Sequence, residues 1–471
     1  MRRSLTFALF CAALGMAAVA PPALAHPGQM TIVQDDALVY RGSAEVRERA
    51  LDEFKALGAD AVKLQVYWNE VAPPGSDKPA GFDATDPNAY AWGAYDDAVR
   101  GILARGMRPY LALGGRGPDW ATVKRSRYRG TYRPDPEEFG LFARAAGARF
   151  PEVDIWSVWN EPNLFSWLAP QYRKGVAISP AIYRRLYLAG HSGLSASGQS
   201  GDRILLGELM PNGRRSRSKV APLEFLREMV CLNRRYRPYR GLAARRRSCP
   251  RAVGRIPTSG LAYHPYTTPG GDERDEASIF KLRRVRATLD ALARRGKLPH
   301  RTPVWITEFG WQTDPPDTVF GVSLRRAPGL MDQSEWIAFR DPRVASYAQY
   351  TLRDDPPRRG SGFTRWAGWQ AGLRFWNGGP KRGVYEAFRM PAFVRLLGRN
   401  RVEVFGGLRT AGGERATIDV RVPRGRYRSL GSAQLNAAGY FRKVFRIGRA
   451  ADARYRITIG GRAREKSPVS R

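Results

Sequence analysis

The stretch Val153-Asp-Ile-Trp-Ser-Val-Trp-Asn-Glu-Pro-Asn163 decides how the rest of the chain is interpreted. Its first part is apolar or aromatic on both faces, which is typical of a buried strand in a parallel sheet. Pro162 cannot donate a hydrogen bond to a strand ladder and disfavours helical geometry at Glu161, so we expect the strand to end there. The pattern predicts a carboxylate at the rim of a parallel sheet, where α/β folds build their sites. For a lone glutamate, a solvated strand end would be the simpler interpretation.

A second stretch, Pro303-Val-Trp-Ile-Thr-Glu-Phe-Gly-Trp311, has the same design. An apolar run leads to Glu308, and Gly310 follows where the strand gives way. The separation between Glu161 and Glu308 leaves room for about three further strand–helix units of a barrel. Two carboxylates on one rim are what glycosidic bond cleavage requires, one as acid and one as nucleophile or base.

The segments Trp-Asn-Glu-Pro and Ile-Thr-Glu-Phe-Gly-Trp resemble the acid/base and nucleophile strands of retaining (β/α)8-barrel glycoside hydrolases of the cellulase-like superfamily, clan A. The form Asn-Glu-Pro-Asn is closest to xylosidase-like members, and the superfamily also includes cellulase-like ones. The resemblance implies a TIM barrel in which Glu161 is the acid/base and Glu308 the nucleophile. It implies no cofactor and no metal, and a carbohydrate as the partner.

The same resemblance implies roles for further residues. Asn160 would hydrogen-bond the sugar 2-hydroxyl, Tyr266 would hydrogen-bond the nucleophile, and His264 would line the sugar subsite. Family members usually carry an arginine that steadies the nucleophile on the second strand, where this chain has Lys63. Lysine cannot form the bidentate fork of arginine, so its support of the nucleophile is a departure from the family. Candidate sugar platforms, with core packing as the alternative, are Trp68, Trp311 and Trp369, or Trp366 in place of Trp369.

Strand and helix patterns alternate along most of the chain and predict an α/β fold. We expect barrel strands at 30–39, 61–68, 107–113, 153–159, 204–210, 258–266, 303–308 and 344–352. From about residue 398 the pattern changes to short alternating strands, which indicate a small β-sandwich that binds carbohydrate or braces the barrel. The expected divisions are a signal peptide at 1–25, a catalytic barrel at 26–397, the β-sandwich at 398–462 and a disordered tail at 463–471.

The first residues are typical of a secretory signal. Arg2 and Arg3 form a basic end, an apolar run follows, and small residues precede a cleavage site after Ala25. The apolar run is too short to favour a membrane span, and no later segment is long and apolar enough to form one. We therefore expect an exported chain. In an oxidising compartment Cys231 and Cys249 would form a disulfide, with two free buried thiols as the alternative.

The chain is strongly basic, with a formal net charge of +35. Such a balance attracts nucleic acid, anionic lipid or acidic polysaccharide. The arginines are nevertheless dispersed along the whole chain, which a compositional bias also explains. Two clusters stand out, at 214–219 and at Arg245-Arg246-Arg247, and we interpret them first as solvated loop charge and second as a contact for an acidic glycan.

Several classes of function have little support in the sequence. With 4 histidines in the chain and no clustered His/Cys motif, a multi-histidine zinc site is not indicated, and neither a P-loop nor a Gly-x-Ser-x-Gly elbow is present. Two alternatives to an enzyme remain open. One is a catalytically silent carbohydrate-binding or cell-wall-associated barrel, and the other is a nucleic-acid-binding protein, against which the export signal and the absence of a binding motif argue. We expect a monomer.

Overall fold

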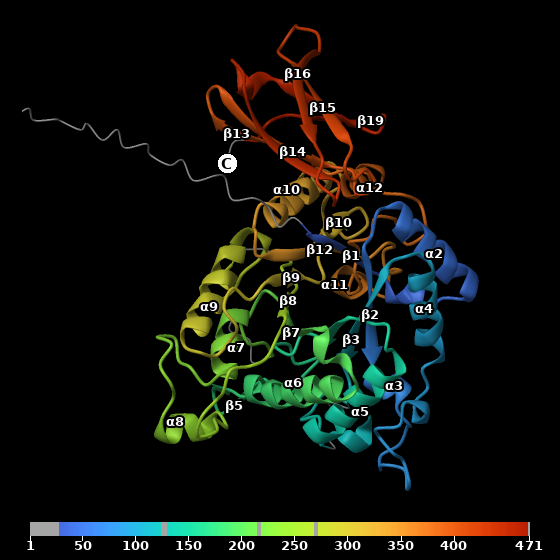
Figure 1. Cartoon of the computed structure of the whole chain (residues 1–471), viewed down its shortest axis with the longest axis vertical. Helices are drawn as coiled ribbons and strands as arrows, with labels where there is room; N and C mark the ends of the chain where they lie inside the picture. The colour runs from blue at the N-terminus through green and yellow to red at the C-terminus, as the bar shows by residue number, and fades with distance from the viewer. Residues whose placement is uncertain (1–27, 124–129, 214–217, 268–271, 470–471) are drawn as a thin grey trace, which may run out of the picture.

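The computed structural model describes residues 28–123, 130–213, 218–267 and 272–469 (Figure 1). Eight parallel strands close into a barrel, in the order β1-β12-β9-β8-β7-β4-β3-β2. The barrel closes because β12 pairs with both β9 and β1. The strands are β1 (Met30–Gln34), β2 (Ala61–Tyr67), β3 (Arg108–Gly114), β4 (Ile155–Val158), β7 (Arg203–Leu209), β8 (Gly260–Tyr263), β9 (Val304–Ile306) and β12 (Val344–Tyr350). The predicted (β/α)8 barrel is confirmed.

Helices lie around the barrel (Figure 1). In α2 (Ala44–Ala56) the Ser43 hydroxyl accepts a hydrogen bond from the Val46 amide and caps the helix. Asp135 caps a later helix in the same way, with Pro136 in the first turn. The longer helices are α2 (Ala44–Ala56), α4 (Gly93–Ala104), α5 (Pro136–Arg149), α6 (Ser179–Ala196), α7 (Pro222–Met229), α9 (Leu282–Arg294), α10 (Ala327–Phe339) and α12 (Arg382–Arg389). The shorter ones are α1 (Asp36–Val39), α3 (Trp68–Val71), α8 (Gly241–Arg246) and α11 (Gly362–Arg365).

Six of the eight expected strands are shorter in the structure, and the first two of them end in a short helix. The first ends at Gln34, because the side chain of Asp35 accepts from the Leu38 amide and caps α1. The second ends at Tyr67, and Trp68 begins α3. Both strands give way to a short helix at the carboxyl end of the barrel.

The C-terminal strands form two antiparallel sheets that share one hydrophobic core. Val404, Ile418, Phe441 and Ile457 are buried between them, so the predicted β-sandwich is confirmed. One sheet has the order β13-β14-β17 and the other β16-β15-β18-β19. The strands are β13 (Ala392–Gly398), β14 (Arg401–Gly407), β15 (Arg415–Arg421), β16 (Arg428–Gln434), β17 (Tyr440–Arg446), β18 (Arg454–Ile459) and β19 (Arg462–Lys466). Two short pairs lie elsewhere: β5 (Tyr172–Arg173) with β6 (Val176–Ala177), and β10 (Thr313–Asp314) with β11 (Val322–Ser323).

The expectation of a disordered tail at 463–471 is wrong for the described residues. These residues include most of β19, which pairs with β18, and Val469 bonds to the backbone of Val394. Arg464 and Lys466 both form ion pairs with Asp332 of α10, whose carboxylate is buried. The basic residues at the end of the chain are therefore paired with a buried acid of the barrel. The sandwich also begins earlier than expected, at Ala392.

Arg409 joins the sandwich to the barrel. Its guanidinium donates to the hydroxyl of Thr31 at 2.9 Å, to the carbonyl of Phe388 and to the carboxylate of Glu335. A Cβ on Gly58 would lie 2.5 Å from the Cβ of Arg409, so this approach requires glycine, which also has a φ of +78° at the end of α2. Because Thr31 lies near the amino end of β1, these contacts are at the barrel end opposite the predicted catalytic rim.

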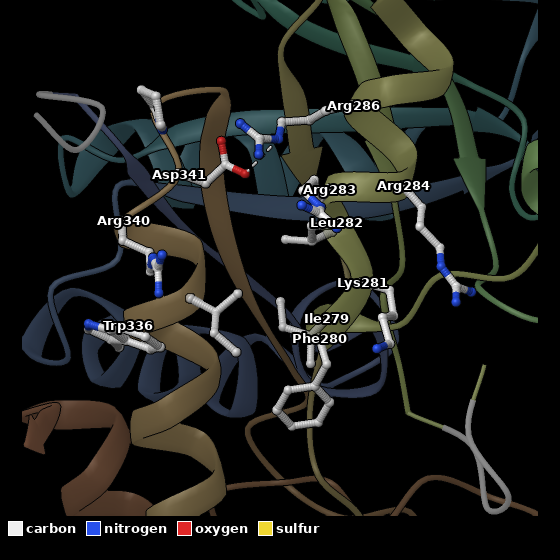
Figure 2. A pocket seen from close by; sticks show the side chains of 12 residues that line it. Ile279, Phe280, Lys281, Leu282, Arg283, Arg284, Arg286, Trp336, Arg340 and Asp341 are labelled. Atoms are coloured by element: carbon white, nitrogen blue, oxygen red, sulfur yellow. Dashed lines mark ion pairs between the residues drawn. The ribbon is translucent and has the colours of Figure 1, made fainter. Parts of the chain in front are cut away.

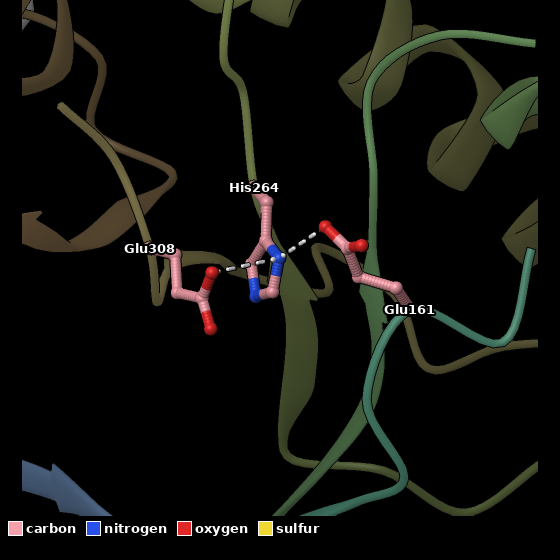
Figure 3. A group of neighbouring side chains, drawn as sticks. All are labelled: Glu161, His264 and Glu308. Carbon is pink, nitrogen blue, oxygen red and sulfur yellow. Dashed lines mark hydrogen bonds and ion pairs between the residues drawn. The ribbon is translucent and has the colours of Figure 1, made fainter. Parts of the chain in front are cut away.

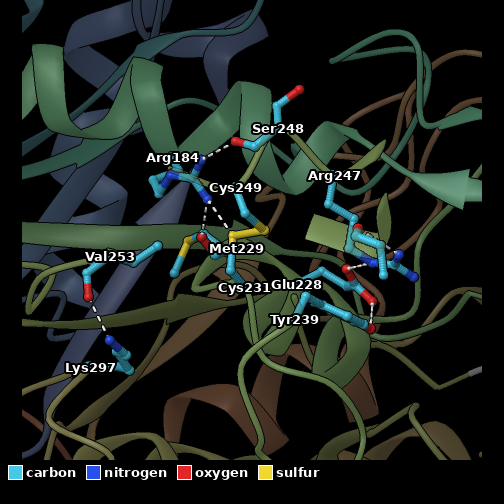
Figure 4. Close-up of a disulfide and its surroundings, with 11 residues drawn as sticks. Arg184, Glu228, Met229, Cys231, Tyr239, Arg247, Ser248, Cys249, Val253 and Lys297 are labelled. Carbon is cyan, nitrogen blue, oxygen red and sulfur yellow. Dashed lines mark hydrogen bonds and ion pairs between the residues drawn. A yellow bond between two sulfur atoms is a disulfide. The ribbon is translucent and has the colours of Figure 1, made fainter. Parts of the chain in front are cut away.

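Cys231 and Cys249 form the expected disulfide, with their Cα atoms 5.9 Å apart (Figure 4). Arg184 of α6 holds both ends of the loop that the disulfide closes. It donates to the carbonyl of Met229 at 2.7 Å and to that of Ser248 at 3.0 Å. The predicted signal peptide lies outside the described residues. Among the helices that are described, none combines the length and the hydropathy needed to cross a membrane.

The junction makes a testable prediction. Asp332→Ala removes the buried partner of Arg464 and Lys466, so the free energy of unfolding of the sandwich should fall by about 3 kcal/mol. Asp419→Ala is the matched control, because Asp419 pairs with Arg456 at the surface and its loss should cost less than about 1 kcal/mol. Calorimetry of the two variants checks this, and equal shifts of the unfolding transition would contradict it.

Candidate active site

The barrel brings together residues that are far apart in the sequence. Glu161 follows β4, His264 and Tyr266 follow β8, and Glu308 follows β9, so all four lie at the carboxyl end of the barrel. Lys63 reaches the same place from within β2. Figure 3 shows the ring of His264 between the carboxylates of Glu161 and Glu308, which come from opposite sides.

The backbone around Glu161 is held in an unusual conformation. Trp159 and Glu161 have φ values of 69° and 36°, in the left-handed region that residues other than glycine seldom adopt. The Glu161 amide donates to the carbonyl of Glu208 at 3.0 Å, and the side chain of Asn163 bonds to both the amide and the carbonyl of Met210. Such outliers persist only where the surroundings enforce them, and they concentrate at functional sites.

Glu308 is surrounded by Lys63, Tyr266 and His264. The Lys63 ammonium lies 2.9 Å from its Oε1, and the Tyr266 hydroxyl donates to its Oε2 at 3.3 Å. The His264 Nδ1 lies 3.5 Å from Oε2. Lys63 cannot form the two parallel hydrogen bonds of an arginine, but its ammonium group does lie beside the nucleophile candidate.

A third carboxylate, Glu208 of β7, was missed in the sequence. The strand has a register irregularity between Gly207 and Leu209, and Glu208 has a φ of 70°. This bulge turns the side chain into the barrel, and bulges of this kind often aim a side chain at a site. The available signal was an ionisable residue after a glycine in an otherwise apolar strand, which must find a partner if it is buried.

Glu208 lies at the centre of a buried hydrogen-bond network. It accepts from Lys63, from the hydroxyl of Tyr110, from that of Ser157 at 2.6 Å and from His264 Nε2 at 3.2 Å. Burial by itself would raise the pKa of its carboxyl, but the charge of Lys63 and the contact with His264 outweigh burial and lower that pKa to about 2. Glu208 is therefore a permanent anion beneath the site.

His264 is held as a cation by the acids around it. Burial alone would lower its pKa, but the charge of Glu308 and the hydrogen bonds to Glu161 and Glu208 raise it to about 9. The imidazolium therefore donates from Nδ1 to Glu161 at 3.0 Å and from Nε2 to Glu208. The carboxylates likewise keep the pKa of Lys63 above its ordinary value despite burial.

One oxygen each of Glu161 and Glu308 and one nitrogen of His264 all lie within 4.8 Å of one another. A metal ion could bind a group of this composition. It would have to displace the proton of His264, whose pKa of about 9 keeps the nitrogen protonated at neutral pH, and it would face the ammonium of Lys63. The electrostatics of the group therefore favour a proton over a metal.

The candidate sugar platforms have different surroundings. Trp369 is partly exposed and stacks on Tyr266 with ring centroids 4.7 Å apart, which places it beside Glu308. Trp311 is mostly buried, and its indole donates to Ser334 of α10. Trp68 is 0% exposed between Phe139 and Phe142, so no face of its ring is open to a sugar and this expectation is wrong.

Asn160 lies directly before Glu161 and is buried. Its side-chain oxygen has no hydrogen-bond partner among the described residues. A buried polar atom without a partner carries a free-energy cost, and in a native structure it calls for an explanation such as a ligand. Its position and unused oxygen fit the predicted contact with a sugar hydroxyl.

Comparisons with known proteins agree with the fold. No protein-family model and no curated protein matches the chain. Among solved structures, a glucosidase from Croceicoccus marinus has a TM-score of 0.51 at 10% identity, with 93% of this chain and 96% of that chain covered. A β-glucosidase from Trichoderma harzianum has a TM-score of 0.45 at 12% identity, with coverage of 79% and 98%. A β-1,4-D-mannanase from Cryptopygus antarcticus has 0.40 at 11%, with 77% and 90%. At 10% identity the likeness to the Croceicoccus marinus glucosidase concerns the fold alone.

The charge network predicts the titration of His264. Glu208→Gln removes an anion bonded to Nε2, so the pKa of His264 should fall from about 9 toward its ordinary value. NMR of the imidazole nitrogens measures it directly, since the chain has only 4 histidines. The control is Glu386→Gln on the exposed face of α12, which should leave the titration unchanged. An unshifted His264 in the Glu208 variant would show that Glu208 does not hold the proton there.

Proposed function

We propose that this chain is a secreted glycoside hydrolase that cleaves a β-linked oligo- or polysaccharide with retention of configuration. The observation that carries the proposal is the pair Glu161 and Glu308 on one barrel rim, with carboxylate oxygens within 4.8 Å of each other. Retaining enzymes have carboxyl groups about 5–5.5 Å apart, whereas inverting enzymes need about 6.5–9.5 Å to admit a water molecule. The short separation supports a direct attack by one of the two carboxylates.

The first step transfers the sugar to the enzyme. Glu161 donates its proton to the glycosidic oxygen while a Glu308 oxygen attacks the anomeric carbon, so the bond to the leaving group breaks as the bond to Glu308 forms. Lys63 and Tyr266 orient Glu308 through contacts with different oxygens. The Asn160 side chain bonds the sugar 2-hydroxyl, and Trp369 offers a ring face at the edge of the site.

The second step releases the sugar. Glu161 removes a proton from water, the resulting hydroxide attacks the anomeric carbon, and the bond to Glu308 breaks. The His264 ring donates to Glu161 at 3.0 Å and so orients this side chain for both steps.

The alternative is a catalytically silent, carbohydrate-binding barrel. It would keep the aromatic residues of the rim without needing a proton donor next to a nucleophile. The network around Glu208 favours the enzyme, because burying three acids, a lysine and a histidine together is costly and a binding protein has no use for it.

Glu308→Gln should abolish turnover, because an amide cannot act as the nucleophile. We expect kcat on aryl β-glycosides to fall by at least about four orders of magnitude with an unchanged fold. Glu386→Gln, an isosteric change at an exposed glutamate of α12, should retain full activity. Hydrolysis by the Glu308 variant at the wild-type rate would rule out the assignment.

Glu161→Ala tests the acid/base and the stereochemistry together. An aryl glycoside with a good leaving group should still glycosylate Glu308, and hydrolysis of the intermediate should then be slow because no base activates water. Added azide needs no base and should restore turnover, with the β-glycosyl azide as product. An α-azide would indicate inversion, and no rescue would remove Glu161 from the second step.

A further inference from the structure

A strongly cationic pocket lies on the side of the barrel next to the β4–α6 connection. Its volume is about 430 Å³, within the range of about 300–1,000 Å³ that is typical of ligand sites. Ile178, Ala181 and Ile182, around the start of α6, give it an apolar floor. The basic residues that line it are Arg133, Arg173, Lys174, Arg185, Arg245 and Arg246.

The charge of this pocket is uncompensated. No carboxylate occurs among the described residues that line it, and none of its six basic side chains has an ion pair within the described part of the chain. Burial, and then the charge of Arg185, lower the pKa of the neighbouring Arg184 guanidinium to about 10. Six like charges around one cavity repel one another, so an anion that enters it relieves the repulsion.

Three separate parts of the fold build the pocket. Arg133 lies in the connection after β3, and its amide bonds to the carbonyl of Ala169. Arg173 and Lys174 lie in the β5–β6 hairpin, which belongs to the connection that begins with Glu161. This wall is therefore continuous with the loops that follow the carboxyl ends of β3 and β4.

The segment that contains α8 contributes a second wall of the pocket, and a disulfide closes this segment. Arg245 and Arg246 lie in α8, inside the loop that the Cys231–Cys249 disulfide closes. Arg184 ties both ends of this loop to α6, as Figure 4 shows through its bonds to Met229 and Ser248. The backbone segment that carries the two arginines is thus anchored at both ends. An anchored backbone reduces the conformational entropy that is lost when an anion binds.

A larger basic groove between α9 and α10 differs in this respect (Figure 2). Its volume is about 760 Å³, and Lys281, Arg283, Arg284 and Arg340 are among its residues. Asp341 nevertheless lies within it and pairs with Arg286 at 3.0 Å. Figure 2 shows Arg284 directed away from this pair, so the charges of the groove do not converge on one point. The pocket beside α6 is the better anion site.

We propose that the pocket formed by the β5–β6 hairpin, the start of α6 and α8 binds the acidic groups of a polysaccharide. Guanidinium groups match the geometry of carboxylate and sulfate oxygens and bind them through charge-assisted hydrogen bonds. A single-stranded nucleic acid is disfavoured, because such ligands stack their bases on aromatic rings and none is present among the described lining residues. The proposal is independent of hydrolysis, since it concerns binding at a different part of the surface.

Binding of defined probes to the full-length protein tests this proposal. The probes are oligogalacturonate for carboxylate, dextran sulfate for sulfate, neutral dextran, and a single-stranded DNA of matched charge. We expect oligogalacturonate or dextran sulfate to bind in calorimetry, with an affinity that falls as salt is added, and neutral dextran not to bind. The stronger of the two anionic probes identifies the acidic group. Tighter binding of the DNA, or no binding of either acidic polysaccharide, would overturn the proposal.

Two pocket variants and a control distinguish binding at this pocket from nonspecific electrostatic attraction to a basic protein. Arg245→Gln/Arg246→Gln should weaken binding by about tenfold or more, because each charged contact contributes substantially. Arg173→Gln/Lys174→Gln, in the β5–β6 hairpin, should weaken binding by a similar factor. The control Arg426→Gln/Arg428→Gln removes equal charge from exposed positions of the sandwich and should change the affinity by less than about twofold. An equal loss in all three variants would show nonspecific attraction and overturn the proposal.

Both pocket variants change exposed side chains, so the fold and the disulfide should persist and can be verified by calorimetry and thiol titration. Their activity on neutral aryl glycosides should equal that of the wild type, since neither pair touches Glu161 or Glu308. The outcome of the binding test is thus separate from that of the hydrolysis test. An inactive protein that still binds through this pocket would support the present proposal alone.

Discussion

The ammonium group of Lys63 lies inside the barrel between Glu208 and Glu308, and the geometry of the site depends on this buried charge. Taking an ammonium out of water costs several kcal/mol unless it is paired and hydrogen-bonded. The barrel can therefore hold Lys63 of β2 only because Glu208 of β7 and Glu308 after β9 place their carboxylates next to its ammonium group. The same constraint fixes the side chain of Glu308, which has an ammonium on one oxygen and the Tyr266 hydroxyl on the other. Removing one charge from this cluster leaves the others unpaired, so its members act as a unit.

Much of this arrangement could be predicted from the sequence, because the information is local. An apolar strand that stops at Asn-Glu-Pro or Thr-Glu-Phe-Gly places a carboxylate at the rim, and the barrel order then brings Glu161 and Glu308 together.

The partner of Lys63 could not be predicted in this way. Glu208 faces the interior only because a bulge at Gly207 turns it inward, and its contacts join strands 145 residues apart. Trp68 was misplaced for a similar reason, since a short helix turns it from the rim into an aromatic core. Lys466 was expected in a tail because its buried partner, Asp332, lies in a distant helix.

The sandwich is attached to the barrel at a distance from Glu161 and Glu308. Its strongest described contacts run through Arg409, Arg464 and Lys466 to Glu335 and Asp332 of α10, and to Thr31 near the amino end of β1. These groups lie on the far end and the outer wall of the barrel, away from Glu161 and Glu308. Buried ion pairs of this kind specify one orientation more than they add stability. The contacts thus support a bracing role for the sandwich, one of the two roles considered from its sequence.

Charge is distributed differently in the two regions that face a ligand. At the catalytic rim the positive charges of Lys63 and His264 are met by carboxylates at hydrogen-bonding distance. That environment suits an uncharged sugar ring, because an anionic substituent there would meet Glu308, whose charge is needed for attack. In the pocket beside α6 the cations have no described acidic partner. Exposed charges act over about 10 Å in salt, so this excess influences only a ligand that reaches the pocket itself. The two regions are compatible with one polymer whose residue at the scissile bond is neutral and whose acidic groups lie some distance along the chain.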